Sequence, residues 1–593
     1  MPPDMISEQF EFAAGKRGRY RNYPPYGPSL LAAHLRRDDI DVSILNLNHA
    51  VLRGCHEAES ESSFDFEKVI EDEIEAAVSD VHPDLIGITC MFSQTHASLM
   101  RVVKKLRAAE PGVPFAAGGV HITNSLANLI TATKLLDDLP EIDFFFQFES
   151  DVSFRNFVRV ANGVADASDL AQYVFRVEGT VKSITRRQVP QGDDLNQIAA
   201  HDLLKTKELT NYGNVGSFYC HKPNGTRFTT VLSNRGCRAQ CTFCSVRNFN
   251  GVGVRRRNVD SVIEELKILK YEHGVEHIVW LDDDFLYDRA ESIRLFNEMV
   301  KHDIRITFDC SNGVIAASCT EEVMSAATDA GCIGLLIGME SGSRRILREV
   351  KKPGTVETFL KASEVLRRFE QIDARVFLMI GFPNETYREI FETITVAHEL
   401  GLDWYNVAVL QPLPNTPIFD SMLDEGLIEP DFDKIRWNTG SIGIGKVSKF
   451  GGAPHDLQAC DFKDAFNLRN MDRIPERGEL DDIWAYMNFH LNFNKLMFEN
   501  RERKLIQRLA YIESLCDLIV PENVFAMYCL GYLQMRVHGA VSRATTDRLR
   551  QKLAGMPYWQ NRFDEFGWSV RHLEEGVFPD RIDYVTAAHA ELL

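Results

Sequence analysis

The chain has 593 residues with a formal net charge of −19 at pH 7, of which 45% are hydrophobic and 25% are charged. This length exceeds the size at which single cores stop growing, so we expect two large domains and a smaller one. The acidic balance excludes a broad nucleic-acid footprint, no apolar run approaches the ~18 residues of a membrane span, and no secretory signal is readable at the N-terminus, so we expect a cytoplasmic protein.

Residues 18–185 alternate amphipathic segments with short apolar runs. We expect helices within 22–37, 62–82, 96–112 and 124–138, and strands within 41–48, 83–92, 113–119 and 143–148. This order predicts a doubly wound parallel sheet, an α/β fold whose ligand lies beyond the carboxyl ends of the strands. The candidate ligand loops at those ends are Ser93-Gln94-Thr95, Gly118-Gly119-Val120-His121 and Glu149-Ser150.

These loops and the opening "YPPYGPSLLAAHLR" resemble the cobalamin-binding domain that precedes the barrel in many radical enzymes. The family shows "GG-x-H", present here at Gly118–His121, and "G-E-G-E", which reads "FESD" at 148–151. Many cobalamin domains also supply an axial histidine from a D-x-H-x-x-G string. The nearest match, "DVHPDL" at Asp80, lies at the entrance of a strand, so His82 is expected to be an ordinary surface residue. The resemblance then implies cobalamin bound by residues 1–185 with no histidine on cobalt, and His121 is the residue that would overturn this. A nucleotide site is the alternative, but no G-x-G-x-x-G supports it.

A polar connector, residues 186–230, leads to the strand-like run "RFTTVLSN" and then to three cysteines, Cys237, Cys241 and Cys244. Their C-x3-C-x2-C spacing lets three thiolates meet at one centre. A structural zinc would need a fourth protein ligand, and Cys220-His221 is the nearest supplement. An iron-sulfur cluster held by three cysteines leaves one iron open, which suits a cluster that binds and reduces a ligand.

After the cysteines, amphipathic helices alternate with apolar strands, the βα pattern of a parallel barrel or partial barrel over residues 231–425. Functional residues of such a barrel belong at the strand carboxyl ends. The polar and glycine-containing positions found there are Asp282, Asp283 and Asp284, Asn312, Glu340, and Gly381-Phe382-Pro383. Two ordinary alternatives stand beside this: the acids could cap the next helix, and Glu340 could pair with Arg344 or Arg345.

The cysteine spacing with Phe243, and the strings "WLDDDF", "IGMESGS" and "IGFPNET", resemble the motifs of the radical S-adenosylmethionine enzymes. The resemblance implies a 4Fe-4S cluster on the three cysteines, whose open iron holds S-adenosylmethionine. It implies that Glu340 contacts this ligand and that Gly381, Phe382 and Pro383 line its adenosine side. Phe243, Asp282, Asp283 and Asn312 are the further candidate cofactor residues.

Residues 426–593 show helical apolar periodicity, with one faint helical-repeat unit, and predict a mostly helical cap or substrate domain. The Gly-rich loop 438–456 is either a lid over the substrate or a surface loop without a catalytic role.

Together the two resemblances, which cover residues 20–425, imply a cobalamin-dependent methyltransferase. Its substrate would be an unactivated carbon, or less often phosphorus, of a small molecule such as a natural-product intermediate. The expected partners are this substrate and an external reductant of flavodoxin or ferredoxin type, with no nucleic acid and no membrane. A cobalamin-assisted cyclase or rearrangement, a polar methyl transfer, and a non-catalytic iron-sulfur or zinc binding protein are the alternatives.

Overall fold

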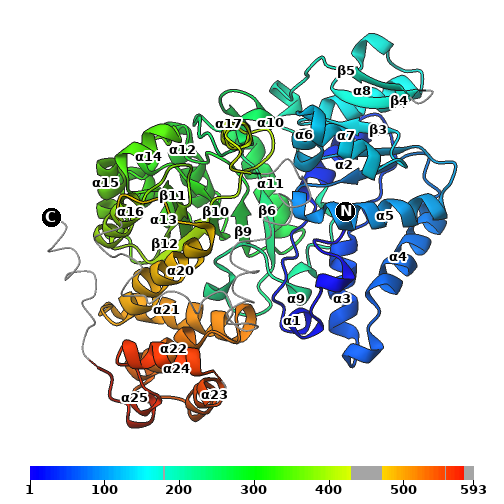
Figure 1. Ribbon diagram of the computed structural model, residues 1–593. Helices are drawn as coiled ribbons and strands as arrows, with labels where there is room; N and C mark the ends of the chain where they lie inside the picture. The colour runs from blue at the N-terminus through cyan, green and yellow to red at the C-terminus, as the bar shows by residue number, and fades with distance from the viewer. Residues whose placement is uncertain (178–179, 429–470, 555, 580–593) are drawn as a thin grey trace.

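The computed structural model describes residues 1–177, 180–428, 471–554 and 556–579, so the predicted lid loop 438–456 lies outside the described residues. Figure 1 shows an N-terminal α/β part in blue and cyan, a central parallel sheet with its helices in green, and C-terminal helices in orange and red. Among the described residues, no helix combines the length and apolar character needed to cross a bilayer.

The N-terminal part is built on a sheet of order β1-β2-β3-β4-β5. Strands β1, β2 and β3 are parallel, and the hairpin β4–β5 adds two antiparallel strands at one edge. Its strands are β1 (Ile86–Thr89), β2 (Phe115–Gly118), β3 (Phe144–Phe146), β4 (Tyr173–Val177) and β5 (Thr180–Ile184). Its helices are α1 (Phe12–Lys16), α2 (Tyr26–Arg36), α3 (Leu47–Glu57), α4 (Phe66–Val81), α5 (His96–Ala109), α6 (Val120–Leu126), α7 (Leu129–Asp138) and α8 (Asp151–Ala161).

The α/β architecture is confirmed, but the predicted strand 41–48 does not form. Residues 41–46 have no regular structure, and α3 begins at Leu47. The backbone of this segment bonds to the chain's first residue: the Met1 amino group donates to the Leu45 carbonyl (2.7 Å) and the Leu47 N–H donates to the Met1 carbonyl (3.1 Å). Alternating apolar residues predict a strand only where a neighbouring strand can pair with it, and here that pairing is not made.

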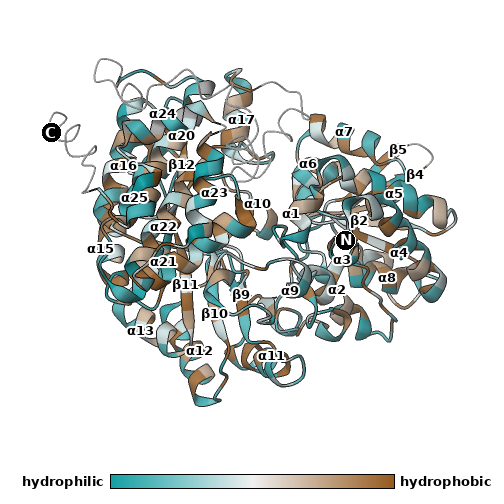
Figure 2. Ribbon diagram, turned by 90° about the horizontal axis from the view of Figure 1, so that it is seen from below, coloured by the Kyte–Doolittle hydropathy of each residue, from teal (hydrophilic) through white to brown (hydrophobic). Residues whose placement is uncertain are grey.

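The central part is a 6-stranded sheet of order β13-β12-β11-β10-β9-β6 in which every pair is parallel. Its strands are β6 (Phe228–Val231), β9 (His277–Trp280), β10 (Thr307–Val314), β11 (Cys332–Glu340), β12 (Asp373–Ile380) and β13 (Trp404–Val409). Its helices are α11 (Val259–Tyr271), α12 (Arg289–Lys301), α13 (Glu321–Asp329), α14 (Arg344–Glu349), α15 (Val356–Leu366), α16 (Tyr387–Leu400) and α17 (Pro417–Asp424). Figure 2 shows β11 as a hydrophobic ribbon among helices of mixed hydropathy, as expected for parallel strands covered on both faces.

The C-terminal helices cover the open edge of this sheet at β13. Asn492 accepts a hydrogen bond from the Tyr405 N–H and donates one to the Tyr405 carbonyl, both at 2.8 Å, so its amide takes the place of a neighbouring strand. The Trp484 indole donates to the Val407 carbonyl (2.7 Å). These helices are α20 (Arg477–Asn488), the π-helix η11 (Phe489–Asn494), α21 (Glu502–Ser514), the π-helix η12 (Leu515–Ile519), α22 (Val524–His538), α23 (Arg543–Ala554), α24 (Pro557–Glu565) and α25 (Val570–Glu575).

Candidate functional site

The three cysteines lie on a loop that a short hairpin closes at its base. Strand β7 (Asn234–Arg235) precedes the loop and pairs antiparallel with β8 (Arg255–Arg256), while α10 (Val246–Asn250) follows the last cysteine. Gly236 turns the chain with φ +87°, where an added Cβ would meet the Gly253 carbonyl oxygen at 2.5 Å. Further along, Thr242 receives a hydrogen bond from the Ile418 N–H (3.1 Å) and donates its own N–H to the Val350 carbonyl (3.0 Å). The loop is therefore fixed at the carboxyl ends of the sheet.

The three thiols are half-buried, and their burial raises the pKa of Cys237, Cys241 and Cys244 to about 11. The thiols are therefore protonated at neutral pH. A metal ion that binds them displaces these protons, as it does for most cysteine metal ligands. Among the described residues, no three His, Cys, Asp or Glu side chains form a ready site for a single metal ion. A cluster binds each thiolate through a different iron, so its ligands need not meet at one point.

The acids after β9 support this loop. Asp282 is buried and accepts hydrogen bonds from the N–H groups of Ser233 (3.0 Å) and Asn234 (2.8 Å). Asp284 pairs with Arg238 at 2.9 Å, inside the cysteine loop. The alternative that these acids cap the next helix is wrong, because Asp288 caps α12 by accepting from the Glu291 N–H (3.1 Å).

Asp283 lies between these two supports and faces α10. It accepts a hydrogen bond from the Asn250 side chain (3.0 Å), and burial, followed by repulsion from Asp282, raises its pKa to about 7. Asn312 lies within β10 rather than after it, is exposed, and donates to the Leu281 carbonyl (2.6 Å). Asp283 therefore lies beside the helix that follows the cysteines, whereas Asn312 contacts the backbone just before Asp282.

Glu340 is the last residue of β11 and has φ +69°, a backbone conformation that non-glycine residues rarely adopt and that is common at functional sites. Its side chain pairs with Lys352 at 2.9 Å, and both side chains are nearly buried. The ordinary alternative for Glu340, an ion pair with Arg344 or Arg345, is wrong in its partner, since Arg344 pairs with Glu357 and Arg345 with Glu389.

Lys352 is a candidate site residue that sequence reasoning missed. Burial alone would lower the pKa of Lys352, but Glu340 and the Cys241 thiol outweigh burial and raise it. Its ammonium lies 6.0 Å from the centre of the Phe243 ring. An added Cβ at Gly338 would meet this ammonium at 2.6 Å, so the glycine leaves the room that Lys352 occupies. The sequence offers little to identify Lys352 as a site residue, because it lies more than a hundred residues after the cysteines that it approaches.

The Gly381-Phe382-Pro383 turn follows β12 and is held by Glu385. One oxygen of Glu385 accepts from the N–H groups of Gly381 (2.6 Å) and Phe382 (3.2 Å), and burial raises the pKa of Glu385 to about 8. Phe382 packs against Phe243 with ring centres 6.1 Å apart. The turn and the cysteine loop, predicted separately, therefore share one apolar contact.

The predicted cobalamin loops lie at the carboxyl ends of β1, β2 and β3. Residues Ser93, Gln94 and Thr95 form one 3-10 turn, with Gln94 exposed, and Gly118 ends β2. Gly119 has φ +110°, and an added Cβ would lie 2.3 Å from the Cys90 carbonyl oxygen. The glycine is thus required by the close approach of the backbone at the end of β1.

His121 is buried on α6, beside Val120, and takes part in a chain of polar contacts. Its Nε2 lies 2.9 Å from His96 Nδ1, whose other ring nitrogen lies 2.9 Å from Asp138. Its Nδ1 lies 3.2 Å from the Ser93 hydroxyl. Both ring nitrogens of His121 are therefore engaged by protein. His82, in contrast, ends α4 in a left-handed conformation and is exposed at the opposite edge of the sheet.

The two sheets meet at these edges. Asn124 of α6 contacts Asn415 of the central part (3.3 Å), and Asn415 accepts through its carbonyl from Asn248 of α10. Glu149, in the loop after β3, and Asp151, the first residue of α8, pair with Arg235, two residues before Cys237. The loops of the N-terminal sheet thus face the cysteine loop.

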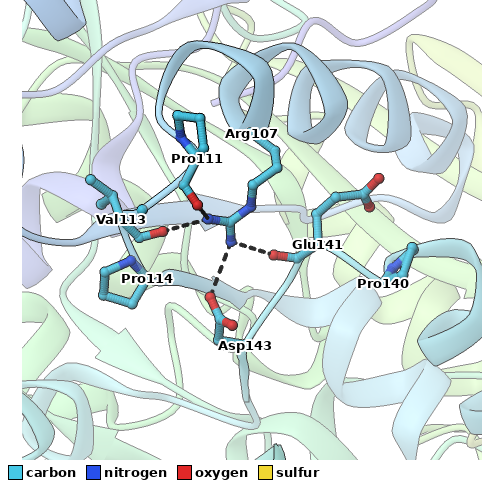
Figure 3. Close-up of a pocket in the computed structure, with 8 residues that line it drawn as sticks. Arg107, Pro111, Val113, Pro114, Pro140, Glu141 and Asp143 are labelled. Carbon is cyan, nitrogen blue, oxygen red and sulfur yellow. Dashed lines mark hydrogen bonds and ion pairs between the residues drawn. The ribbon is translucent and has the colours of Figure 1, made fainter. Parts of the chain in front are cut away.

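The hollow drawn in Figure 3 is not part of this site. It is lined by residues at the amino ends of β2 and β3, the edge opposite the predicted loops. Arg107 fills its centre and donates to the carbonyls of Val113 and Glu141, both at 2.7 Å, and to Asp143 (3.1 Å). These contacts tie loops together and leave the guanidinium engaged by protein.

Two family models match the chain. The model described as the B12 binding domain matches residues 19–142, and the model described as the Radical SAM superfamily matches residues 231–397. The chain therefore carries a B12-binding domain followed by a radical SAM domain, the pair of domains found in cobalamin-binding radical SAM enzymes. A radical SAM domain uses a 4Fe-4S cluster and S-adenosylmethionine, and a B12-binding domain takes cobalamin.

Named relatives and solved structures agree with this assignment. The chain is 27% identical over 405 residues to the uncharacterized methyltransferase PH0819 of Pyrococcus horikoshii, covering 68% of this chain and 80% of the relative. It is 22% identical over 473 residues to cytidylyl-2-hydroxyethylphosphonate methyltransferase of Streptomyces wedmorensis, covering 75% and 86%. Its fold matches OxsB, a cobalamin-dependent S-adenosylmethionine radical enzyme, with TM-score 0.56 and 15% identity, covering 96% of this chain and 80% of OxsB. It also matches the radical S-adenosylmethionine methyltransferase TsrM of Kitasatospora setae with TM-score 0.53 and 15% identity, covering 68% and 75%.

The residues of this radical SAM chain fit the groups that the family uses. Cys237, Cys241 and Cys244 supply three thiols on one fixed loop, and the nearby Lys352 cation favours the ionised form of Cys241 and Cys244. Exposed Met91 and Phe92, 57% and 50% accessible, offer apolar surface before the Ser93 turn, where the sheet faces the barrel. The roles of the individual residues remain predictions.

Replacing Glu340 by Gln is expected to weaken S-adenosylmethionine binding at least tenfold while the cluster stays intact. A hydrogen bond to a charged group contributes about 1.5–3 kcal/mol, and about 1.4 kcal/mol is a factor of ten in affinity. Calorimetric titration of the anaerobically reconstituted protein measures this. Lys352→Met is the companion variant: unchanged affinity with lower thermal stability in both variants would reduce Glu340 to a structural ion pair.

The cob(II)alamin form of the protein is expected to show no nitrogen superhyperfine splitting in its electron paramagnetic resonance spectrum. The reason is that His121 has both ring nitrogens engaged and His82 lies at the far edge of the sheet. His121→Ala should leave the cobalt signal unchanged, with His82→Ala as the matched control. A nitrogen splitting that disappears only in His121→Ala would show a histidine on cobalt.

Proposed function

We propose that the chain is a cobalamin-dependent radical SAM methyltransferase that modifies an unactivated carbon, or phosphorus, of a small biosynthetic intermediate. The observation that carries the proposal is the meeting of two strand-end sites. The loops after β1, β2 and β3 face the loop of Cys237, Cys241 and Cys244, with the ion pair from Glu149 and Asp151 to Arg235 joining them. Methyltransferases among the relatives, one of them acting on a phosphonate, support the same reaction class.

When bound, the cofactors supply a deoxyadenosyl radical and a transferable methyl group, and the protein's task is to align them with the substrate. Lys352 offers a buried cation beside the thiols and orients Glu340. Phe243 and Phe382 form an apolar wall next to the Gly381 turn. The buried acids Asp282 and Asp284 hold the cysteine loop in place through backbone and arginine contacts.

We further propose four functional segments: residues 1–185 for cobalamin, a connector over 186–230, the radical SAM partial barrel over 231–425, and a helical substrate cap over 426–593. Helices of this segment cover β13 through Asn492 and Trp484, which supports a cap beside the last barrel strand. An external one-electron reductant of flavodoxin or ferredoxin type is part of this proposal, because splitting S-adenosylmethionine into a radical takes up one electron.

A cyclase reaction is the second candidate. It is favoured by the relative named anaerobic magnesium-protoporphyrin IX monomethyl ester cyclase of Rubrivivax gelatinosus, 22% identical over 373 residues. That match covers 62% of this chain and 63% of the relative. Both shares are smaller than in the matches to the two methyltransferases.

Counting deoxyadenosine, S-adenosylhomocysteine and product in one anaerobic assay with fractionated small-molecule extract separates these reactions. A radical methylation releases one of each, because one S-adenosylmethionine is cleaved and a second supplies the methyl group. A polar transfer releases S-adenosylhomocysteine without deoxyadenosine, and a cyclase releases deoxyadenosine without S-adenosylhomocysteine. Absence of both small products from a fully loaded protein would instead support a non-catalytic binding protein.

A further inference from the structure

The loop after β3 carries two buried acids whose partners lie in the radical SAM part. Asp151 forms two hydrogen bonds with Arg235, one from each terminal nitrogen, at 2.7 and 3.0 Å. Glu149 pairs with the same arginine at 3.4 Å and also with Arg255. Glu149, Asp151 and Arg235 are only 5%, 6% and 8% accessible. Charges buried to this degree need well-placed partners, so these contacts fix the geometry of the groups that make them.

The two arginines lie opposite each other at the base of the cysteine loop. Arg235 ends β7, Arg255 begins β8, and the two residues are direct partners in the hairpin register. Arg235 is two residues before Cys237, while Asp151 begins α8 directly after the β3 loop. The bidentate pair of Arg235 and Asp151 therefore connects the base of the cysteine loop to the start of α8 in the cobalamin domain. A bidentate arginine–carboxylate contact fixes orientation as well as distance.

The two acids of this junction, Asp151 and Glu149, differ in the direction of their pKa shifts. Burial alone would raise the pKa of Asp151, but Arg235 outweighs burial and lowers it, so this carboxylate stays ionised. Burial raises the pKa of Glu149 despite Arg235 and Arg255. Asp151 is accordingly the stronger partner, and its bond to Arg235 is the one that defines the junction.

A second buried cluster joins the same two parts elsewhere. Tyr26 of α2 donates to Glu265 of α11 (3.2 Å), and Glu265 also binds His201 (2.7 Å) and Arg257. Burial would raise the pKa of Glu265, but Arg257 and His201 outweigh burial and lower it to about 2. This cluster fastens the domains through hydrogen bonds and ion pairs that do not include Arg235. Loss of the Arg235 pair is thus expected to release the β3 loop without separating the domains.

We infer that Arg235, through Asp151, is a positioning residue that sets where the cobalamin loops stand relative to the iron-sulfur loop. The inference rests on the proposed function in one respect, the binding of both cofactors at these loops. It also reassigns Glu149, which sequence reasoning placed at the cofactor, to the junction between domains. Arg187 reinforces the same region, because it stacks over the Phe148 ring at 4.1 Å and donates to the Phe249 carbonyl.

The test compares Arg235→Lys and Asp151→Asn with Arg155→Lys as the matched control. Arg155 lies on the same helix as Asp151 and pairs with Asp38, within the cobalamin domain. In the reduced holoenzyme, pulsed electron paramagnetic resonance measures the distance between cob(II)alamin and the cluster. Wild type and Arg155→Lys should give one narrow distribution. Arg235→Lys and Asp151→Asn should give a broader or shifted one at unchanged cofactor content, and the double variant should be no worse than either single variant.

Hydrogen–deuterium exchange of the cofactor-free chain provides a readout that needs neither cofactor. Exchange in segments 147–154 and 234–240 should rise together, severalfold, in both variants and not in the control. An unchanged distance distribution in Arg235→Lys, or a rise confined to 234–240, would overturn the inference and leave Arg235 a local support of the cysteine loop. If wild type takes up no cobalamin, the proposed function fails while the exchange experiment still decides the coupling between the two loops.

Discussion

Replacing Cys237, Cys241 and Cys244 together by Ala is expected to abolish the visible iron-sulfur absorbance and to reduce S-adenosylmethionine cleavage to background. These thiols are the only cysteines on the loop at the barrel mouth, and burial raises the pKa of each to about 11, so metal is what converts them to thiolates. Replacing all three removes every thiol that we propose as a ligand of the cluster. Anaerobic reconstitution followed by iron analysis and chromatography of deoxyadenosine measures both effects.

Cys55→Ala is the matched control for this experiment. Cys55 is buried in the N-terminal part, and burial raises the pKa of its thiol to about 11 as well, yet it lies on α3 beside Gly15 and the Phe10 ring, away from the cysteine loop. It should keep wild-type iron content and cleavage. A triple variant that still binds iron and cleaves S-adenosylmethionine would disprove the assignment of the cluster to this loop, as would zinc in the anaerobically purified protein.

Gly119→Leu is expected to destabilise the cobalamin domain by roughly 2–6 kcal/mol and to reduce cobalamin retention at least tenfold. Two costs add: a left-handed backbone at φ +110° strains a leucine by about 1–3 kcal/mol, and forced overpacking adds about 1–3 kcal/mol. The clash is with the Cys90 carbonyl at 2.3 Å, so the ends of β1 and β2 must separate. Urea denaturation and gel filtration with cobalamin measure stability and retention.

Gly163→Leu separates these two costs. Gly163 also has a left-handed backbone, φ +71°, but nothing lies within 4 Å of an added Cβ. It should show the strain without the clash, and cobalamin retention should stay at the wild-type level. Equal destabilisation by the two variants would mean that the contact with Cys90 is unimportant, and full retention by Gly119→Leu would move the cobalamin site away from this turn.

The sequence was sufficient to predict most strands and the loops that follow them. Cys237, Glu340 and Gly381 each follow an apolar run, and parallel strands bring their carboxyl ends to one edge. The predicted strand 41–48 failed because its alternation cannot show whether a partner strand lies beside it, and Met1 takes its backbone contacts instead.

The partners of the predicted residues could not be found in the same way. Lys352 reaches Glu340 across helix α14, and Arg235 reaches Asp151 across the boundary between two domains. Such pairs depend on how elements far apart in sequence are packed, which local periodicity does not contain. The Glu149 loop shows the consequence, since its acids resemble a ligand loop but bind the neighbouring domain's arginines.

The most direct test of the central claim is methyl transfer from S-adenosylmethionine to the protein's own cobalamin, which needs no knowledge of the substrate. The anaerobically reconstituted and reduced protein is incubated with S-adenosylmethionine carrying an isotope label in its methyl group, and protein-bound cobalamin is then isolated and analysed by mass spectrometry. The account predicts labelled cobalamin and an equal amount of S-adenosylhomocysteine. Protein that retains both cobalamin and cluster yet transfers no label would contradict it.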